Sequence, residues 1–142
     1  MHILGVELTG NEANICLLSK SGNLFALPDC RSRRFSVADI NSAEQLRDFQ
    51  STVKKLIEDY HIDKIAIKQR PAKGKFAGSA IGFKLEAALQ LIGDNIGVQL
   101  ISAAEIKDSL KDNPMPIQFA DTGLKKFQQL AFITAFVACW LS

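Results

Sequence analysis

A run of positive charge in the middle of the chain has the clearest capacity for chemistry. Six Lys and Arg residues fall between residues 64 and 85, and no Asp or Glu offsets them there. Small residues follow, and the first turn of a helix presents free N–H groups that bind anions. We expect a surface that binds phosphate or nucleic acid, formed by Lys68, Arg70, Lys73, Lys75 and Lys84. The alternative is an ordinary solvated face.

A carboxylate near the amino terminus is the candidate for catalysis or metal binding. Glu7 lies near the end of the apolar run HILGVEL (2–8). Such a side chain can ligate a divalent cation, or it can be solvated or paired with a lysine. Since Glu7 is the only candidate ligand, we expect no cofactor unless the protein is active, in which case Mg²⁺ is the cation.

The sequence lacks the residue patterns that are typical of other kinds of functional site. The three cysteines form no C-x-x-C pair, and His2 and His61 show no pattern of metal-ligand spacing. The G-x-S-x-G and Walker A motifs are absent, as are the features of a signal peptide. The longest apolar run, 130–141, is too short to span a bilayer. We therefore expect a cytoplasmic protein with no membrane partner.

The periodicity of apolar residues indicates the elements that must position these side chains. Alternating or continuous apolar runs predict strands, and spacings of three and four predict helices. The strands are expected over 2–8, 13–20, 23–29, 63–68 and 98–102, and the helices over 41–60, 77–93, 103–111 and 122–140. Asn41 or Ser42 can cap the first helix.

The order of these elements predicts the fold class. Three strands joined by short turns form an antiparallel meander, and the strands that follow alternate with helices. We expect an α/β fold with a five-stranded mixed sheet covered by helices. The 142 residues are predicted to form a single domain, 1–142.

Two short motifs, together with this order, resemble the RNase H-like fold and especially the RuvC-type Holliday-junction resolvases. Residues 3–10, ILGVELTG, are similar to the strand I-L-G-I-D-P-G that carries the first catalytic carboxylate of that family, at the position of Glu7. Residues 66–69, AIKQ, are similar to A-I-E-Q, which puts Lys68 at the second acid. The chain also resembles small uncharacterised bacterial proteins of this fold.

The resemblance implies an active site in which several carboxylates hold two metal ions. This chain departs from that pattern, because Lys68 reverses the charge of the second acid. The family's remaining acids come from its last helix, and residues 122–142 contain no Asp or Glu. We therefore expect the two-metal site to be degraded.

The last helix is apolar around much of its circumference. Phe132, Phe136 and Trp140 are spaced to line one side of it. Either this side is buried within one chain, or it forms the seam of a homodimer.

Three functions remain open. The first is a non-catalytic RNase H-like module that binds DNA or RNA. The second is a Mg²⁺-dependent nuclease or resolvase that uses Glu7 with acids recruited from Glu86, Asp108 or Asp121. The third is a structural or regulatory homodimer that binds no nucleic acid.

Overall fold

The structure, a computed structural model, describes residues 1–70, 79–93 and 95–141. The strands are β1 (His2–Thr9), β2 (Glu12–Ser21), β3 (Leu24–Ala26), β4 (Arg34–Ser36), β5 (Lys64–Lys68) and β6 (Gly97–Ile101). The α-helices are α1 (Ala43–Tyr60), α2 (Ala80–Gln90), α3 (Ala103–Asp112) and α4 (Gln129–Ala138). Two short 3₁₀ helices, η1 (Phe119–Asp121) and η2 (Lys126–Gln128), precede α4.

One mixed sheet organises the chain. Its strand order is β3-β2-β1-β5-β6, and β4 also pairs with β2. The pairs β1–β2, β2–β3 and β2–β4 are antiparallel, whereas β1–β5 and β5–β6 are parallel. The predicted α/β class and mixed sheet are confirmed. The structure adds β4, which has three residues and is too short to show a period of two.

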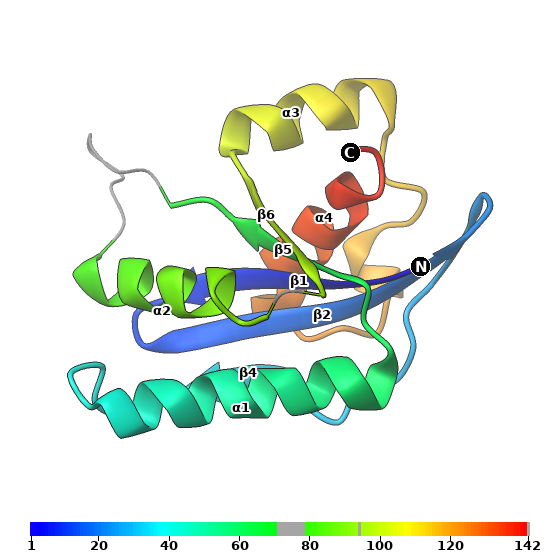
Figure 1. Cartoon of the computed structure of the whole chain (residues 1–142). Helices are drawn as coiled ribbons and strands as arrows, with labels where there is room; N and C mark the ends of the chain where they lie inside the picture. Colours follow the sequence, from blue (N-terminus) through cyan, green and yellow to red (C-terminus); the bar gives the residue numbers. More distant parts are fainter. Residues whose placement is uncertain (71–78, 94, 142) are drawn as a thin grey trace.

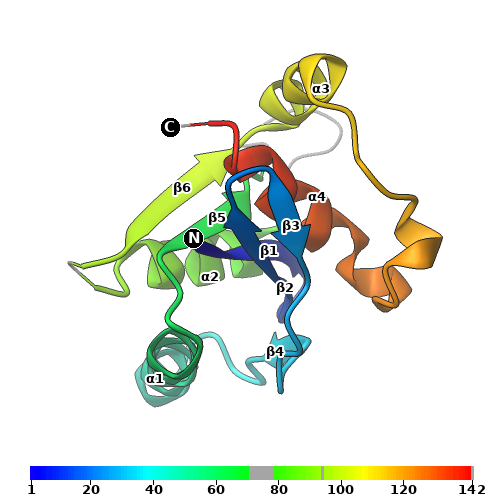
Figure 2. The ribbon, with the colours of Figure 1, turned by 90° about the vertical axis from the view of Figure 1, so that its right-hand side faces the viewer.

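The helices cover the sheet in two layers (Figures 1 and 2). Side chains alternate between the faces of a strand, so Leu4, Val6 and Leu8 of β1 pack with α1 and α2. Ile3, from the same strand, packs with α4 on the other face. The face that carries α4 also contacts α3, so each side of the sheet has its own hydrophobic core.

The first helix forms as the sequence predicts. The Ser42 side chain accepts a hydrogen bond from the backbone N–H of Gln45 at 3.2 Å and caps the helix. Phe49, Val53 and Leu56 are buried against the sheet. A short loop joins α1 to β5, so the two elements run in opposite directions. The chain thereby returns to the middle of the sheet at β5.

The last helix begins later than predicted, at Gln129 instead of Thr122. Gly123 adopts φ +77°, a conformation that interrupts a right-handed helix. Of the two alternatives for the aromatic side of this helix, Phe132 and Phe136 follow burial within the chain, since they are only 3% and 2% exposed. Phe119 and Phe25 pack on them, at 6.2 and 5.2 Å between ring centroids. Of the three aromatic residues predicted at a dimer seam, Trp140 alone is substantially exposed, at 41%.

A close contact fixes α4 on the sheet. A Cβ atom added at Gly5 would lie 2.8 Å from Cβ of Ala135 and would overlap the carbonyl oxygen of Ala131. Glycine at this position of β1 therefore lets the backbone of α4 approach the strand. No helix within the described residues is long and apolar enough to cross a membrane.

Candidate functional site

Four polar side chains form a row across the sheet on the face that α4 covers. Arg34 of β4 is opposite Asn14 of β2, and Asn14 is opposite Glu7 of β1. Glu7 and Lys68 each follow directly after the parallel pair Val6 and Ile67. Since Val6 and Ile67 pack in the core beside α1, the next residue of each strand faces the other side. We call Arg34, Asn14, Glu7 and Lys68 the polar row.

Hydrogen bonds connect three members of the polar row. The Asn14 amide donates to Oε1 of Glu7 at 3.3 Å, and Nε of Arg34 donates to Oδ1 of Asn14 at 3.0 Å. Nε of Arg34 also pairs with Oε2 of Glu12 at 2.9 Å. Asn14 is buried, whereas Glu7 and Lys68 are half-buried. The amide thus fixes one oxygen of Glu7 and leaves the rest of the carboxylate available.

The chain before α4 completes the site. The side-chain amide of Gln128 donates to the carbonyl of Ile15 at 2.9 Å, which fixes η2 against β2. Phe127, the preceding residue, lies beneath the guanidinium of Arg34, with Cζ 3.9 Å from the ring centroid. Lys125 and Lys126 come just before it and are exposed. Cations and amides therefore occupy the segment from which the resemblance expects the remaining acids.

The structure describes three of the five predicted phosphate-binding residues, and they do not share one surface. Lys68 belongs to the polar row. Nη1 of Arg70 donates to the carbonyl of Leu8, and the Arg70 side chain lies against Gly82 of α2. Nζ of Lys84 donates to Oδ1 of Asn41 at 3.0 Å, beside the start of α1. Lys73 and Lys75 lie outside the described residues.

Arg70 neighbours a buried acid that the sequence does not single out as such. Glu86 points inward from α2 and is 7% exposed, and its Oε2 has no hydrogen-bond partner among the described residues. Burial raises the pKa of its carboxyl, and the backbone N–H and charge of Arg70 act in the opposite direction. Arg70 and Glu86 therefore contribute to the packing of α2 on the sheet.

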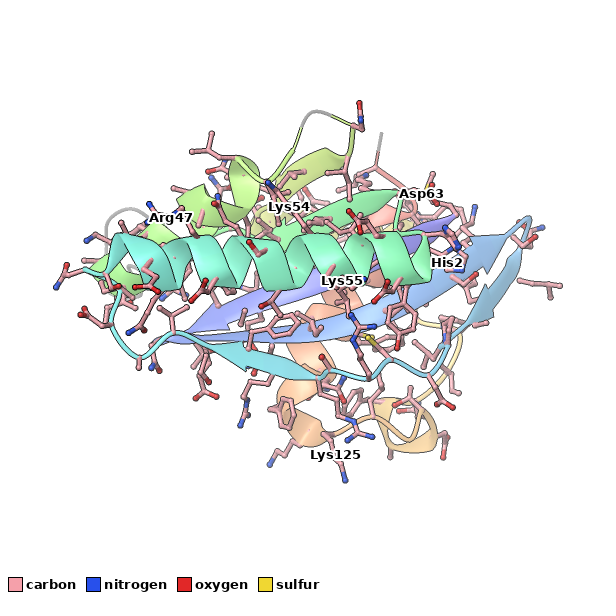
Figure 3. All side chains as sticks on the ribbon, turned by 60° about the horizontal axis from the view of Figure 1, so that its bottom comes forward. His2, Arg47, Lys54, Lys55, Asp63 and Lys125 are labelled. Carbon is pink, nitrogen blue, oxygen red and sulfur yellow. The ribbon has the colours of Figure 1, made fainter. Side chains whose placement is uncertain are left out.

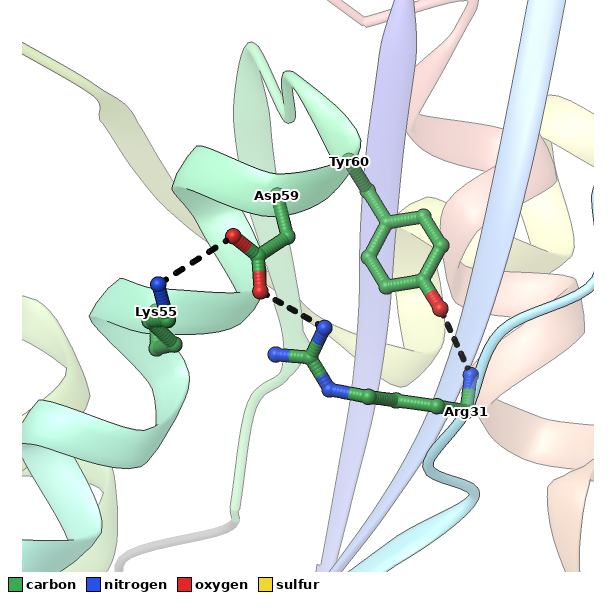
Figure 4. Close-up of polar contacts among 4 residues, drawn as sticks. All are labelled: Arg31, Lys55, Asp59 and Tyr60. Atoms are coloured by element: carbon green, nitrogen blue, oxygen red, sulfur yellow. Dashed lines mark hydrogen bonds and ion pairs between the residues drawn. The ribbon is translucent and has the colours of Figure 1, made fainter.

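The arginines that follow β3 separate to the two faces of the sheet. Nη1 of Arg31 pairs with Oδ2 of Asp59 at 2.6 Å, and its backbone N–H donates to the hydroxyl of Tyr60 at 2.8 Å (Figure 4). The pKa of Asp59 is lowered, mainly by its hydrogen bond to Arg31. Arg31 is thus held by α1, while Arg34 reaches the polar row on the opposite face.

The described part of the chain places no set of acids around Glu7. Within the residues that the structure describes, no three His, Cys, Asp or Glu side chains form a group that could hold a metal ion. Glu86 packs with the core beside α1. Asp108 is exposed on α3 and pairs with Lys111 at 3.8 Å. Asp121 lies at a pocket beside β3, which pairs with the end of β2 farthest from Asn14.

Comparison with known proteins gives the family. A family described as "Protein of unknown function (DUF3010)" matches residues 1–138. This chain is a member of that family. No curated protein matches the sequence.

Solved structures give the fold of this DUF3010 protein. RuvC from Thermus thermophilus superposes with a TM-score of 0.72 at 11% identity, over 99% of this chain and 94% of the other. RuvC of the same organism in complex with a Holliday junction substrate gives 0.69 at 12% identity, with the same coverage. The yeast mitochondrial Holliday junction resolvase Ydc2 gives 0.51 at 10%, over 95% and 74%. The predicted RuvC-like fold is confirmed.

Sequence reasoning missed Asn14, a member of the polar row, and the aromatic ring beside the row. Asn14 is an ordinary strand residue in the sequence, and nothing near it indicates that it contacts Glu7. Arg34 stands in the same short stretch as Arg31, so composition cannot separate their roles. Phe127 was expected inside a continuous helix. Only the register of β4 on β2, and the position of η2, bring these residues together.

Proposed function

We propose that this protein is a non-catalytic nucleic-acid-binding module with a RuvC-like fold. The polar row carries the proposal. A two-metal nuclease needs several carboxylates around the scissile phosphate. Here Glu7 stands between an amide and a lysine, and Lys125, Lys126 and Gln128 precede the last helix. Such a group lacks the carboxylates that a pair of divalent cations requires, and the positive charge that a phosphate would meet comes from Lys68.

The cations of the predicted segment would have different roles in binding. Lys68, in the polar row, would meet the phosphate backbone on the face that α4 covers. Lys84 lies beside the start of α1, so it would make a separate contact on another surface. Arg70 serves as a positioning residue, because its guanidinium is committed to the Leu8 carbonyl and to Gly82. Contacts of this kind attract phosphate without reading base sequence.

Fluorescence anisotropy tests the proposal with labelled single-stranded, duplex and four-way-junction DNA in a salt series. We expect the wild type to bind with a steep salt dependence. The variant Lys68→Ala/Lys84→Ala should lose affinity, and the slope of log K against log salt should fall by about one for each contact removed.

The matched control is Lys54→Ala/Lys55→Ala, which removes the same charge from α1. Figure 3 shows Lys54 and Lys55 on that helix and Lys125 on a distant part of the molecule. Equal losses in both variants would mean that only net charge matters. If the wild type binds none of the three DNAs at low salt, the proposal fails and a structural or regulatory role takes its place.

Nuclease activity is the competing function, because Glu7 is retained and the Asn14 amide orients it. Incubation of the same DNAs with Mg²⁺ or Mn²⁺ separates the two. We expect wild-type cleavage no greater than that of Glu7→Gln. Cleavage by the wild type that Glu7→Gln abolishes would establish a nuclease.

A further inference from the structure

We infer that Arg34, stacked on Phe127, is a platform for an unpaired base of the bound nucleic acid. The inference rests on the proposed function and names its preferred ligand class: DNA or RNA with at least one base outside a continuous duplex. The structural observation is the packing of the guanidinium on the aromatic ring, 3.9 Å from Cζ to the ring centroid, beside Glu7 and Asn14.

The guanidinium is held as a fixed plane. Its Nε is shared between Asn14 at 3.0 Å and Glu12 at 2.9 Å, and the Phe127 ring supports the guanidinium. The hydrogen bond from Gln128 to the Ile15 carbonyl fixes the segment that carries this ring. Even so, 41% of the Arg34 side-chain surface remains exposed. A rigid and partly open guanidinium plane is a surface on which unstacked bases pack.

Charge favours stacking over a phosphate contact at this position. Glu12 pairs directly with Arg34 and offsets its positive charge. The carboxylate of Glu7 lies one hydrogen-bonded residue away, through Asn14. A phosphate approaching Arg34 would therefore meet two acids, whereas a neutral base would not. The exposed Lys125 and Lys126, next to Phe127 in the chain, can meet the phosphates on either side of that base.

Two DNA duplexes that differ in one group provide the test. One carries a single extra adenosine in the middle of one strand, and the other carries an abasic nucleotide at the same place. Both have the same charge and the same interruption of the duplex, so the ratio of their dissociation constants reports the base itself. Stacking on an aromatic or guanidinium group corresponds to about tenfold in affinity, so we expect that ratio for the wild type.

Two variants locate the effect. Arg34→Lys keeps the charge and loses the plane, so the ratio should fall to about one. Phe127→Leu removes the support and should lower the ratio as well. Arg31→Lys is the matched control, because Arg31 also lies near an aromatic ring, 5.5 Å from Tyr60, but on the other face of the sheet. Circular dichroism of each variant checks that it is folded.

The outcomes distinguish the inference from the proposed function. If the wild type binds both duplexes equally well, the platform is wrong and nucleic-acid binding stands. If Arg34→Lys keeps the wild-type ratio, the base stacks elsewhere and the inference is also overturned. If the wild type binds neither duplex nor any other DNA at low salt, both fail together.

Discussion

Glu7 of β1 and Lys68 of β5 lie side by side on neighbouring parallel strands, and their side chains point to the same face of the sheet. They form no ion pair within the described part of the chain, where the salt bridges involve other residues. Glu7 is bound instead by the Asn14 amide. The lysine is therefore not neutralised by its neighbour, and the reversed charge at the second strand end acts on whatever ligand approaches the polar row.

Restoring an acid at this strand end should create a site for a divalent cation. In Lys68→Glu, two carboxylates would stand on adjacent strands, and oxygen ligands of this kind bind Mn²⁺ or Mg²⁺. We expect Mn²⁺ to raise the melting temperature of Lys68→Glu, since a ligand at 100 times its Kd stabilises a protein by about 2.7 kcal/mol. Lys68→Gln is the control, because it removes the charge without adding a ligand. An equal shift in the wild type would show that Lys68 does not oppose metal binding.

Substitution of Gly5 should strongly destabilise the protein. Gly5→Ala forces a methyl group against the backbone of Ala131 and the side chain of Ala135. Overpacking of this kind costs about 2–3 kcal/mol in free energy of unfolding, to be measured by urea denaturation. Gly97→Ala is the matched control, because a Cβ added there meets no described residue beyond its chain neighbours within 4 Å. The close contact would be refuted if both variants unfold at the same urea concentration.

Glu86 should make stability depend on pH. Burial raises the pKa of its carboxyl above the ordinary value of 4.5, so the folded state holds this proton more tightly than the unfolded state. That contribution is complete below pH 4.5 and is lost as the pH rises through the folded pKa.

The variant Glu86→Gln removes this loss. Its free energy of unfolding, relative to the wild type, should increase as the pH is raised from below 4.5 to neutrality. Chemical denaturation at a series of pH values measures it, with Glu58→Gln on the exposed side of α1 as the control. A relative stability that stays constant or decreases with pH would contradict the assignment.

A homodimer through α4 should not form by way of the predicted aromatic face. Phe132 and Phe136 are buried within the chain, so Trp140 is the one residue of the three with an exposed ring. A stable interface needs about 800 Å² from each partner, far more than one indole provides. We expect wild type and Trp140→Ser to give the same sedimentation coefficient. If the wild type is a dimer and Trp140→Ser is a monomer, this prediction is wrong and the aromatic side of α4 does form a dimer interface.

Features that depend on interactions between residues close in the sequence could be predicted, whereas features that depend on contacts between distant residues could not. Ser42, Phe49 and Val53 could be assigned to α1 because capping and helical spacing are local properties. Periodicity also placed β1 and β5. The polar row depends on strand register, which brings residues 7, 14 and 34 side by side, and a period of two fixes the face of a side chain but not its neighbour.

The last helix shows a different limit. Apolar residues surround α4 on all sides because cores from the sheet and from η1 cover it, so no polar stripe marks where it begins. The turn at Gly123 and the 3₁₀ segment η2 are set by tertiary contacts such as Gln128 with Ile15. The site residue Phe127 was thus predicted as part of a helix that starts only two residues after it.

The contact at Gly5 also decides how the site moves. Because β1 and α4 approach closely at Gly5, where Ala131 and Ala135 of the helix have short side chains without rotamers, the two elements should open only when the whole domain opens. Amide protons of β1 and α4 would then exchange with solvent at the slow rate of global unfolding. The distance between Glu7 and the start of α4 would accordingly stay fixed while a ligand binds. The site would therefore bind ligands whose shape fits this fixed arrangement.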